Sequence, residues 1–216
     1  MAVAAAEGGT GRKGAITRER IMDIAEQAVL DKGFGATSID EIIAAAGLTK
    51  SGFIYHFPDK SALARALLTR YIEREDVLFD DIFARAAELS DDPLQRLLIG
   101  LKLLAELLDD LPTAHPGCLV ATYCYQERLF DREVRELNEQ AVRGWRRRFL
   151  GMLEEVERAY PRQDDVRIDA VADMVTGAIE GGIVLSKALN ERNILAEQVM
   201  LLRSYIKLLF TPARAA

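Results

Sequence analysis

GFGATSIDEIIAAAGLTKSGFIYHFPDK, residues 33–60, decides the fold at the start of this 216-residue chain. Ser38 precedes a run of apolar residues at helical spacing, and Glu41 stands three residues after it, which is the capping-box pattern of a helix start. Gly47 ends the run, because glycine adopts the left-handed conformation beyond a helix C-terminus at no steric cost. The pattern predicts a short helix whose start and end are both determined by residues close to them in the sequence.

A second short helix follows within a few residues. Thr49 is suited to cap its start, and Pro58 ends it near Phe57, because the residue before a proline is pushed out of helical dihedral angles. Two short helices joined by a tight turn form a helix-turn-helix, whose second helix fits the major groove of DNA. The stretch therefore predicts a DNA-reading element.

The charge of the chain argues against DNA binding at first sight, since the net charge is −6. Glu19, Asp23 and Glu26, however, share one stripe of the preceding helix, and that stripe can face away from phosphates. Basic residues gather near the expected DNA-reading helices: Arg12, Lys13, Arg18, Arg20, Lys50 and Lys60. We expect a local positive potential despite the acidic total.

The composition excludes several other classes of protein. Cys118 and Cys124 are too few for a disulfide framework, and the first residues lack the pattern of a secretory signal. The longest apolar stretch, residues 170–189, contains Asp173, Glu180 and Lys187, so no membrane span is expected. We expect a cytoplasmic protein.

Helical periodicity extends over most of the chain and predicts an all-α fold. We expect residues 1–16 to be a disordered arm, residues 17–62 to form a three-helix helix-turn-helix domain and residues 63–216 to form a helical effector-binding and dimerisation domain. The first helix should begin at Thr17 and the fourth near Asp59. The expected core of the first domain packs Phe34 against Ile39, Ile42, Leu48, Ile54 and Phe57.

The last two expected helices, about 168–190 and 194–210, are apolar over much of their circumference. A helix of this kind needs cover on two sides. Burial within one chain is one explanation. The interpretation that we favour is a homodimer joined through a two-fold interface of four helices.

The first helix and GFGATSIDEIIAAAGLTKSGFIYHFPDKSAL together resemble the signature of the TetR (tetracycline repressor) family of transcriptional regulators. The close resemblance covers roughly residues 17–65. It implies a homodimer that binds a palindromic operator in double-stranded DNA, usually as a repressor, and that leaves the DNA when a small molecule binds the C-terminal domain. The identity of that effector and the operator sequence are not encoded in these motifs.

Eight residues are candidates for contact with DNA. In a helix-turn-helix, the start of the second helix faces base edges, which selects Thr49, Lys50, Ser51 and Gly52. The resemblance adds Tyr55 and His56 as phosphate contacts. Thr37 and Lys60 sit at helix starts, which favour anions, so both are expected to hold phosphates; they complete the set Thr37, Thr49, Lys50, Ser51, Gly52, Tyr55, His56 and Lys60.

The candidate effector-binding residues are aromatic, methionine and carboxylate side chains on the middle helices, where the family keeps its ligand cavity. They are Tyr123, Trp145, Phe149, Met152, Met174 and Glu180. An aromatic stripe at helical spacing also suits plain core packing, and that alternative stays open. A polar stripe on one expected helix faces either water or the cavity: Asp173, Thr176, Glu180 and Lys187.

No pattern of an enzyme is present. His56 and His115 lack a nucleophile or carboxylate pair at a motif spacing, so we expect neither catalytic residues nor a cofactor. His115 could join Cys118 and Cys124 at a metal, but buried structural cysteines are the better interpretation. The alternative function is a TetR-fold co-regulator that acts through protein contacts without reading DNA.

Overall fold

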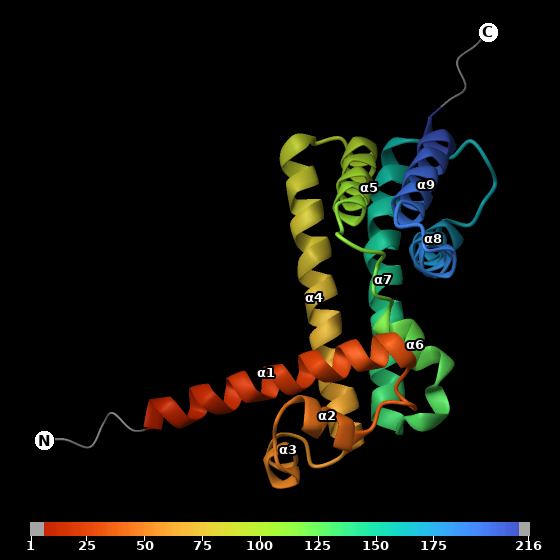
Figure 1. The fold of residues 1–216 in the computed structure, drawn as a ribbon. Coiled ribbons are helices and arrows are strands. Elements are labelled where there is room, and N and C mark those ends of the chain that lie inside the picture. The colour runs from red at the N-terminus through yellow and green to blue at the C-terminus, as the bar shows by residue number, and fades with distance from the viewer. Residues whose placement is uncertain (1–6, 212–216) are drawn as a thin grey trace, which may run out of the picture. The chain divides into compact units, whose positions relative to one another are not determined.

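The regular structure of this protein is helical throughout the part of the chain that is described. The computed structural model describes residues 7–211, and side chains from residue 12 onward. Its elements are α1 (Glu7–Lys32), α2 (Ile39–Ala45), α3 (Lys50–His56), α4 (Lys60–Leu89), α5 (Pro93–Asp109), α6 (Leu119–Tyr125), the 3-10 helix η1 (Glu127–Leu129), α7 (Arg132–Ala159), α8 (Ile168–Leu189) and α9 (Ile194–Phe210) (Figure 1). The predicted all-α fold is confirmed.

Helix α1 begins ten residues before the position that we expected. It starts at Glu7 rather than Thr17, so residues 7–16 of the expected arm are helical. An existing helix extends without the cost of a new nucleus, and Arg12, Lys13 and Ala15 are good helix formers that offset the intervening glycines. Residues 1–6 of the expected arm lie outside the described residues.

Side-chain caps define the helix starts as the sequence predicts. The Ser38 hydroxyl accepts from the Glu41 N–H at 3.1 Å, and the Asp59 carboxylate accepts from the Ala62 N–H at 2.7 Å. The Glu41 carboxylate also accepts from the Lys32 ammonium at 2.5 Å. The Lys32 ammonium and the Ser38 N–H together lower the pKa of Glu41. Lys32 therefore adds an ion pair to the capping box formed by Ser38 and Glu41.

The chain divides into two compact units that are not simple halves of the sequence. The first unit combines the residues up to Tyr71 with Leu119–Asn138, and the second combines Ile72–Cys118 with the residues from Glu139 onward. The first unit therefore contains the helix-turn-helix and also α6, which sequence analysis assigned to the C-terminal domain. Helices α4 and α7 each contribute residues to both units.

An aromatic cluster joins the two segments of the first unit. The ring of Phe34, which follows α1, lies 5.7 Å from that of Tyr123 and 4.7 Å from that of Phe130, between ring centroids. Tyr123 stacks on Phe130 at 4.2 Å, and its hydroxyl donates to the Ala64 carbonyl at 3.0 Å. Phe34 thus has aromatic partners that lie about ninety residues later in the sequence, beyond the core that we expected.

The turn after α1 also receives a side chain from the second segment. The Gly35 N–H donates to the Gln126 Oε1 at 2.9 Å. Gly33 has a φ of +86°, and a Cβ atom built on it would lie 2.3 Å from the Gln126 Nε2. A Cβ on Gly35 would approach the Leu129 side chain to 3.1 Å. The Gln126 amide therefore occupies space that exists only because residue 33 is glycine.

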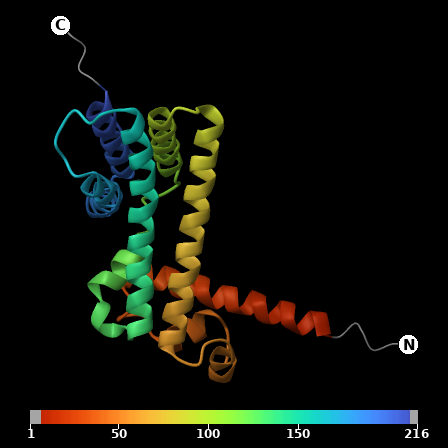
Figure 2. The same ribbon diagram turned by 180° about the vertical axis from the view of Figure 1, so that it is seen from behind.

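The second unit is built around the packing of its last helices. Helix α9 lies against both α5 and α8 (Figures 1 and 2). The Arg203 guanidinium reaches from α9 to the Leu98 carbonyl of α5 at 2.8 Å. Two neighbouring arginines of α7 point to different helices: Arg146 pairs with Asp173 of α8, and Arg148 pairs with Asp76 of α4.

Candidate DNA-binding surface

Helix α3 divides its side chains between an inner and an outer face. Phe53 and Phe57 are buried, and their ring centroids lie 5.8 Å apart. Ile54, which we expected in the core, is 48% exposed, because Phe53 takes the inward position of this helix. With two phenylalanines anchoring one face, the opposite face of α3 is left for contacts outside the protein.

The candidates at the start of α3 lie on the surface. The Thr49 hydroxyl accepts from the Gly52 N–H at 3.2 Å and lies 3.1 Å from the Ser51 hydroxyl. Lys50 is exposed and makes no ion pair with a described residue. A Cβ on Gly52 would lie 3.3 Å from the Thr49 hydroxyl oxygen, so the glycine leaves that cap unhindered. Hydroxyls and one ammonium are therefore presented together.

The end of α3 presents an aromatic pair. Tyr55 is 82% exposed and therefore lies outside the core. Its ring meets that of His56 edge-on at 5.0 Å, and His56 is half-buried beside Gly14 of α1. Both rings can reach groups beyond the protein surface.

Thr37 and Lys60 are held by the protein in ways that the sequence did not predict. Thr37 is 1% exposed, and its hydroxyl donates to the Gly33 carbonyl at 2.9 Å. The Lys60 ammonium donates to the Phe34 carbonyl at 2.8 Å and lies 4.4 Å from the centre of that ring. Partial burial lowers the pKa of Lys60. In these positions the Thr37 hydroxyl closes a turn, and the Lys60 ammonium is directed inward rather than toward a phosphate.

Arg18 of α1 is a basic residue next to α3 that our candidate set left out. Its guanidinium lies 4.9 Å from the centre of the Phe57 ring, which is the residue that ends α3. Arg12 and Lys13 are exposed earlier on α1. The cluster of basic residues in this part of the sequence could have indicated Arg18 as a candidate for contact with DNA.

The acidic stripe of α1 is engaged by an arginine of α4. The Arg70 guanidinium donates to Glu19 at 3.0 Å, to Asp23 at 2.7 Å and to Glu26 at 2.7 Å. Burial alone would lower the pKa of Arg70, but the hydrogen bonds to these carboxylates raise it. The stripe faces α4, so these three carboxylates are bound within the first unit.

Comparison with known proteins identifies this arrangement. Residues 21–67 match the family model described as bacterial regulatory proteins, tetR family. The probable HTH-type transcriptional regulator ArpR of Pseudomonas putida is 36% identical over 95 residues, which are 44% of this chain and 42% of that regulator. Residues 21–67 therefore form a DNA-binding domain of the TetR family. Its relatives are named as transcriptional regulators rather than enzymes, in agreement with our expectation.

Longer alignments to other relatives have lower identity. The HTH-type transcriptional repressor DhaR of a Mycobacterium species is 24% identical over 82% of this chain and 84% of its own length. A TetR regulator from Chloroflexus aurantiacus has the same fold, with a TM-score of 0.73 and 23% identity over 91% of this chain and 96% of that structure. The fold thus extends beyond the segment that the family model matches.

The six candidate effector residues lie in different surroundings. Tyr123 belongs to the first unit, and burial raises the pKa of its hydroxyl. Phe149 is 1% exposed and packs on Phe79 and Phe83, which makes it core. Met152 lines a cavity at the end of α7.

The remaining three candidates have other surroundings. Trp145 is half-buried, and its Nε1 is buried without a hydrogen-bond partner among the described residues. Met174 is 36% exposed. Burial raises the pKa of Glu180, although a hydrogen bond from the Cys118 thiol acts in the opposite direction. Aromatic and methionine content alone did not separate core from cavity.

Two members of the polar stripe of α8, Asp173 and Lys187, are exposed and also bind protein groups. Asp173 pairs with Arg146 of α7, with a contact of 2.5 Å to the arginine Nε. The Lys187 ammonium donates to the Pro116 carbonyl at 2.6 Å, in the loop before α6. Among the described residues no group of three histidine, cysteine or acidic side chains could hold a metal ion, and no described helix is long and apolar enough to cross a bilayer.

Proposed function

We propose that this chain is a dimeric transcriptional repressor that reads a palindromic operator through α3 and leaves it when a small molecule binds. The observation that carries DNA reading is the outer face of α3, where Lys50 and Tyr55 are exposed while the two phenylalanines hold the helix from inside. An ammonium can donate to guanine O6 and N7 or to a phosphate. The repressor assignment is supported by the name of the DhaR relative.

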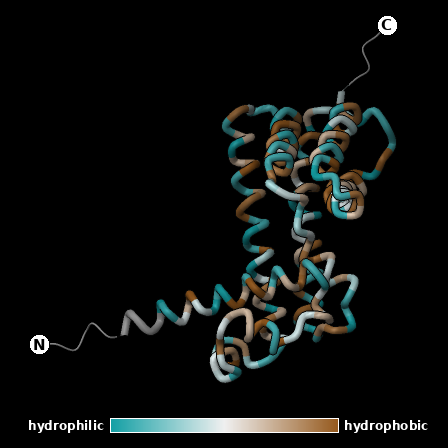
Figure 3. The backbone as a smooth tube through the Cα atoms, viewed as in Figure 1, coloured by the Kyte–Doolittle hydropathy of each residue, from teal (hydrophilic) through white to brown (hydrophobic). Residues whose placement is uncertain are grey.

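The proposed dimer is supported by the exposed apolar side chains of α8 and α9. Leu201 is 62% exposed and Leu208 72% exposed, and they lie about two helical turns apart on one face of α9. Helix α8, whose tube has much hydrophobic colour in Figure 3, adds three exposed apolar residues: Val184, Leu185 and Leu189. A Cβ built on Gly177 or Gly181 would meet nothing within 4 Å. An apolar surface of this kind is expected to be covered by a second copy.

The alternative of a co-regulator that does not read DNA has less support. Such a protein would be free to lose the polar side chains of its recognition helix. Here Thr49, Lys50, Tyr55 and His56 are all retained on or near the surface of the helix-turn-helix. The direct test of both functions is therefore binding to DNA.

The experiment is a footprint of the full chain on the intergenic DNA upstream of its own gene, with the oligomeric state measured by light scattering. We expect a dimer that protects a palindrome whose half-sites are about one DNA turn, roughly 34 Å, apart. Protection of a single half-site, or no specific protection, would contradict the proposal.

A matched pair of substitutions tests the dimer. Leu201→Glu should give a monomer with weakened operator binding, because it places a charge in the proposed interface. Leu89→Glu, at the end of α4, changes a leucine of nearly equal exposure, 61% against 62%, and should leave the dimer intact. A dimer that survives Leu201→Glu together with Leu208→Glu would place the interface elsewhere.

A further inference from the structure

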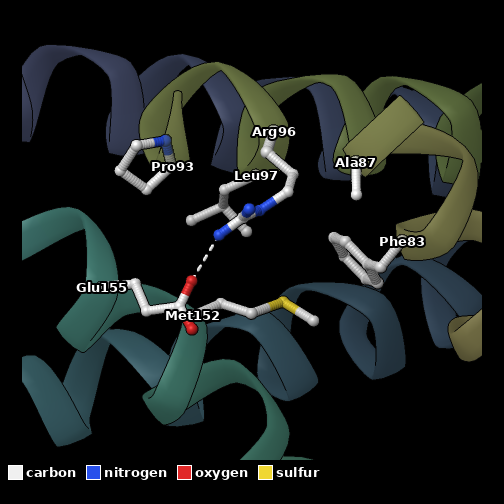
Figure 4. Close-up of a pocket in the computed structure, with 7 residues that line it drawn as sticks. All are labelled: Phe83, Ala87, Pro93, Arg96, Leu97, Met152 and Glu155. Carbon is white, nitrogen blue, oxygen red and sulfur yellow. Dashed lines mark hydrogen bonds and ion pairs between the residues drawn. The ribbon is translucent and has the colours of Figure 1, made fainter. Parts of the chain in front are cut away.

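A cavity of about 310 Å³ lies within the second unit between the ends of α4, α5 and α7 (Figure 4). Two lining residues come from α4, three from the start of α5 and two from α7: Phe83, Ala87, Pro93, Arg96, Leu97, Met152 and Glu155. This volume is at the lower end of the range for ligand sites in proteins. It would accept a body the size of one aromatic ring or a short alkyl chain.

The walls of the cavity are apolar and partly adaptable. Figure 4 shows the Met152 thioether directed toward the Phe83 ring, with Ala87 and Leu97 completing the apolar wall. Phe83 can lie close to α5 because residue 100 is glycine, where a Cβ would stand 2.2 Å from a ring carbon of Phe83. Methionine adjusts its shape at low cost, so the cavity can fit around an apolar occupant.

One charged side chain crosses this apolar space. The Arg96 side chain runs from α5 across the cavity, and its Nη2 donates to the Glu155 carboxylate at the edge (Figure 4). Its Nε and Nη1 take part in no hydrogen bond with a described side chain. The two partners are 32% and 46% exposed, so the ion pair is screened by water and inexpensive to open.

The position of the guanidinium selects the charge of the occupant. A molecule that lies inside the cavity is in reach of Arg96, because the arginine side chain crosses the space while Glu155 stands at its edge (Figure 4). A carboxylate can accept two parallel hydrogen bonds from a guanidinium, which is the strongest pairing available to this side chain. A cation would have to displace Arg96 from the cavity to reach Glu155.

We propose that this cavity binds a small organic carboxylate with an apolar body, held by Arg96 in competition with Glu155. The inference rests on the proposed function, since it assigns a chemical class to the effector. Two of the lining helices, α4 and α7, also contribute residues to the first unit. An occupant that opens the Arg96–Glu155 pair changes a contact between α5 and α7, and so acts on a helix shared with the DNA-reading unit.

The test uses three probes of one shape and different charge. Calorimetric titration of the full chain should show that 3-phenylpropionate binds, and that the neutral 3-phenylpropionamide and the cationic 3-phenylpropylamine bind about tenfold or more weakly. Equal or tighter binding of the amine, or no binding of the carboxylate, would overturn the proposal.

Substitutions of the ion pair should act in opposite directions. Arg96→Gln should weaken 3-phenylpropionate binding about tenfold or more, because the guanidinium is lost. Glu155→Gln should strengthen it, because the competing carboxylate is removed. Lys102→Gln breaks another ion pair of α5, with Glu106, and should change nothing. Weaker binding in Glu155→Gln would overturn the proposal even if Arg96→Gln fails to fold.

Operator binding in the same samples separates the two proposals. Ligand-free protein that protects its operator but does not bind 3-phenylpropionate would overturn the carboxylate site alone. Protein that binds 3-phenylpropionate but protects no DNA would overturn the proposed function alone. If both proposals hold, 3-phenylpropionate should release the operator from the unchanged chain and not from Arg96→Gln.

Discussion

Helices α1 and α3 of the first unit differ in whether their polar side chains are paired within the protein or exposed to solvent. On α1, the carboxylates of Glu19, Asp23 and Glu26 converge on one arginine of α4. On α3, Lys50 and Tyr55 are directed to solvent and make no ion pair with a described residue. The acidic residues of α1 make contacts within the unit, whereas the candidate DNA-contact residues Lys50 and Tyr55 of α3 remain exposed.

The difference teaches how an acidic chain can carry a DNA-reading element. The net charge of −6 counts carboxylates that Arg70 already neutralises in place. What a phosphate meets is set by the charges left unpaired on the nearby surface, because interactions between exposed charges fade over about 8–10 Å at ordinary salt. The placement of the charges therefore matters more than the net charge, and five substitutions test this distinction.

The largest effect should come from Arg70→Met, which removes the shared partner of the three carboxylates. The side chains of Arg70 and Glu26 are only 14% and 12% exposed, so the loss leaves a poorly solvated carboxylate without its guanidinium. We expect a loss of about 2 kcal/mol in the free energy of unfolding, measured in urea, and weaker DNA binding.

Arg65→Met is the matched control on the same helix. Arg65 pairs with Glu133 at 2.6 Å, but its side chain is 46% exposed and that of Glu133 is 69% exposed. Its loss should cost less than about 1 kcal/mol. Equal costs for the two substitutions would mean that the α1 carboxylates are not held by Arg70 in solution.

Lys50→Ala tests the other helix of the comparison, α3, on which Lys50 is exposed. The free energy of unfolding should stay unchanged, because the side chain is exposed. Operator affinity should fall by about 1–3 kcal/mol, with altered preference at one base pair, in a binding titration on a set of operator variants. A uniform loss across all variants would assign Lys50 to a phosphate instead of a base.

Lys60→Met examines a lysine that belongs to neither group. Because its ammonium is bound to the Phe34 carbonyl and ring, we expect a loss of about 1 kcal/mol in stability. Its effect on operator affinity should be smaller than that of Lys50→Ala. Should the salt dependence of DNA binding fall by a full phosphate contact, Lys60 would turn outward in the complex, as the sequence first suggested.

The smallest effect concerns the exposed pair of Glu41 and Lys32. The pKa of Glu41 is below the ordinary value of 4.5, so its stabilising contribution is present above that pH and is lost as the pH falls through the lowered pKa. A titration followed by NMR should place the midpoint below 4.5, and Lys32→Ala should move it back toward that value. An unmoved midpoint would remove Lys32 from the cap.

The sequence predicted those parts of the fold that are controlled by neighbours in the chain. Ser38, Thr49 and Asp59 cap helices where the pattern places them, since a cap involves residues only three apart. The early start of α1 was missed because glycines near its beginning suggest an irregular segment. Periodicity also could not decide between Phe53 and Ile54, which are adjacent and both apolar.

The candidate sites were predictable to different degrees for the same reason. Lys50 and Tyr55 are exposed as expected, because a motif of adjacent residues sets their orientation. Tyr123 was expected in the C-terminal domain but lies in the first unit, and Thr37 was expected at the surface but is buried. Both positions depend on tertiary contacts that local sequence patterns do not indicate. The Arg96–Glu155 pair joins residues 59 positions apart, and no local pattern announces it.

The Gln126 amide at the turn after α1 limits how this regulator can be recombined with others. A chimaeric protein cut after the helix-turn-helix would separate Gly33 and Gly35 from Gln126, and Phe34 from Tyr123. A foreign segment 119–138 with a bulkier side chain at the place of Gln126, just after α6, would collide with the turn instead of binding it. Designers who wish to transplant this DNA specificity should therefore exchange two segments at once, residues 7–71 and 119–138, as a single graft.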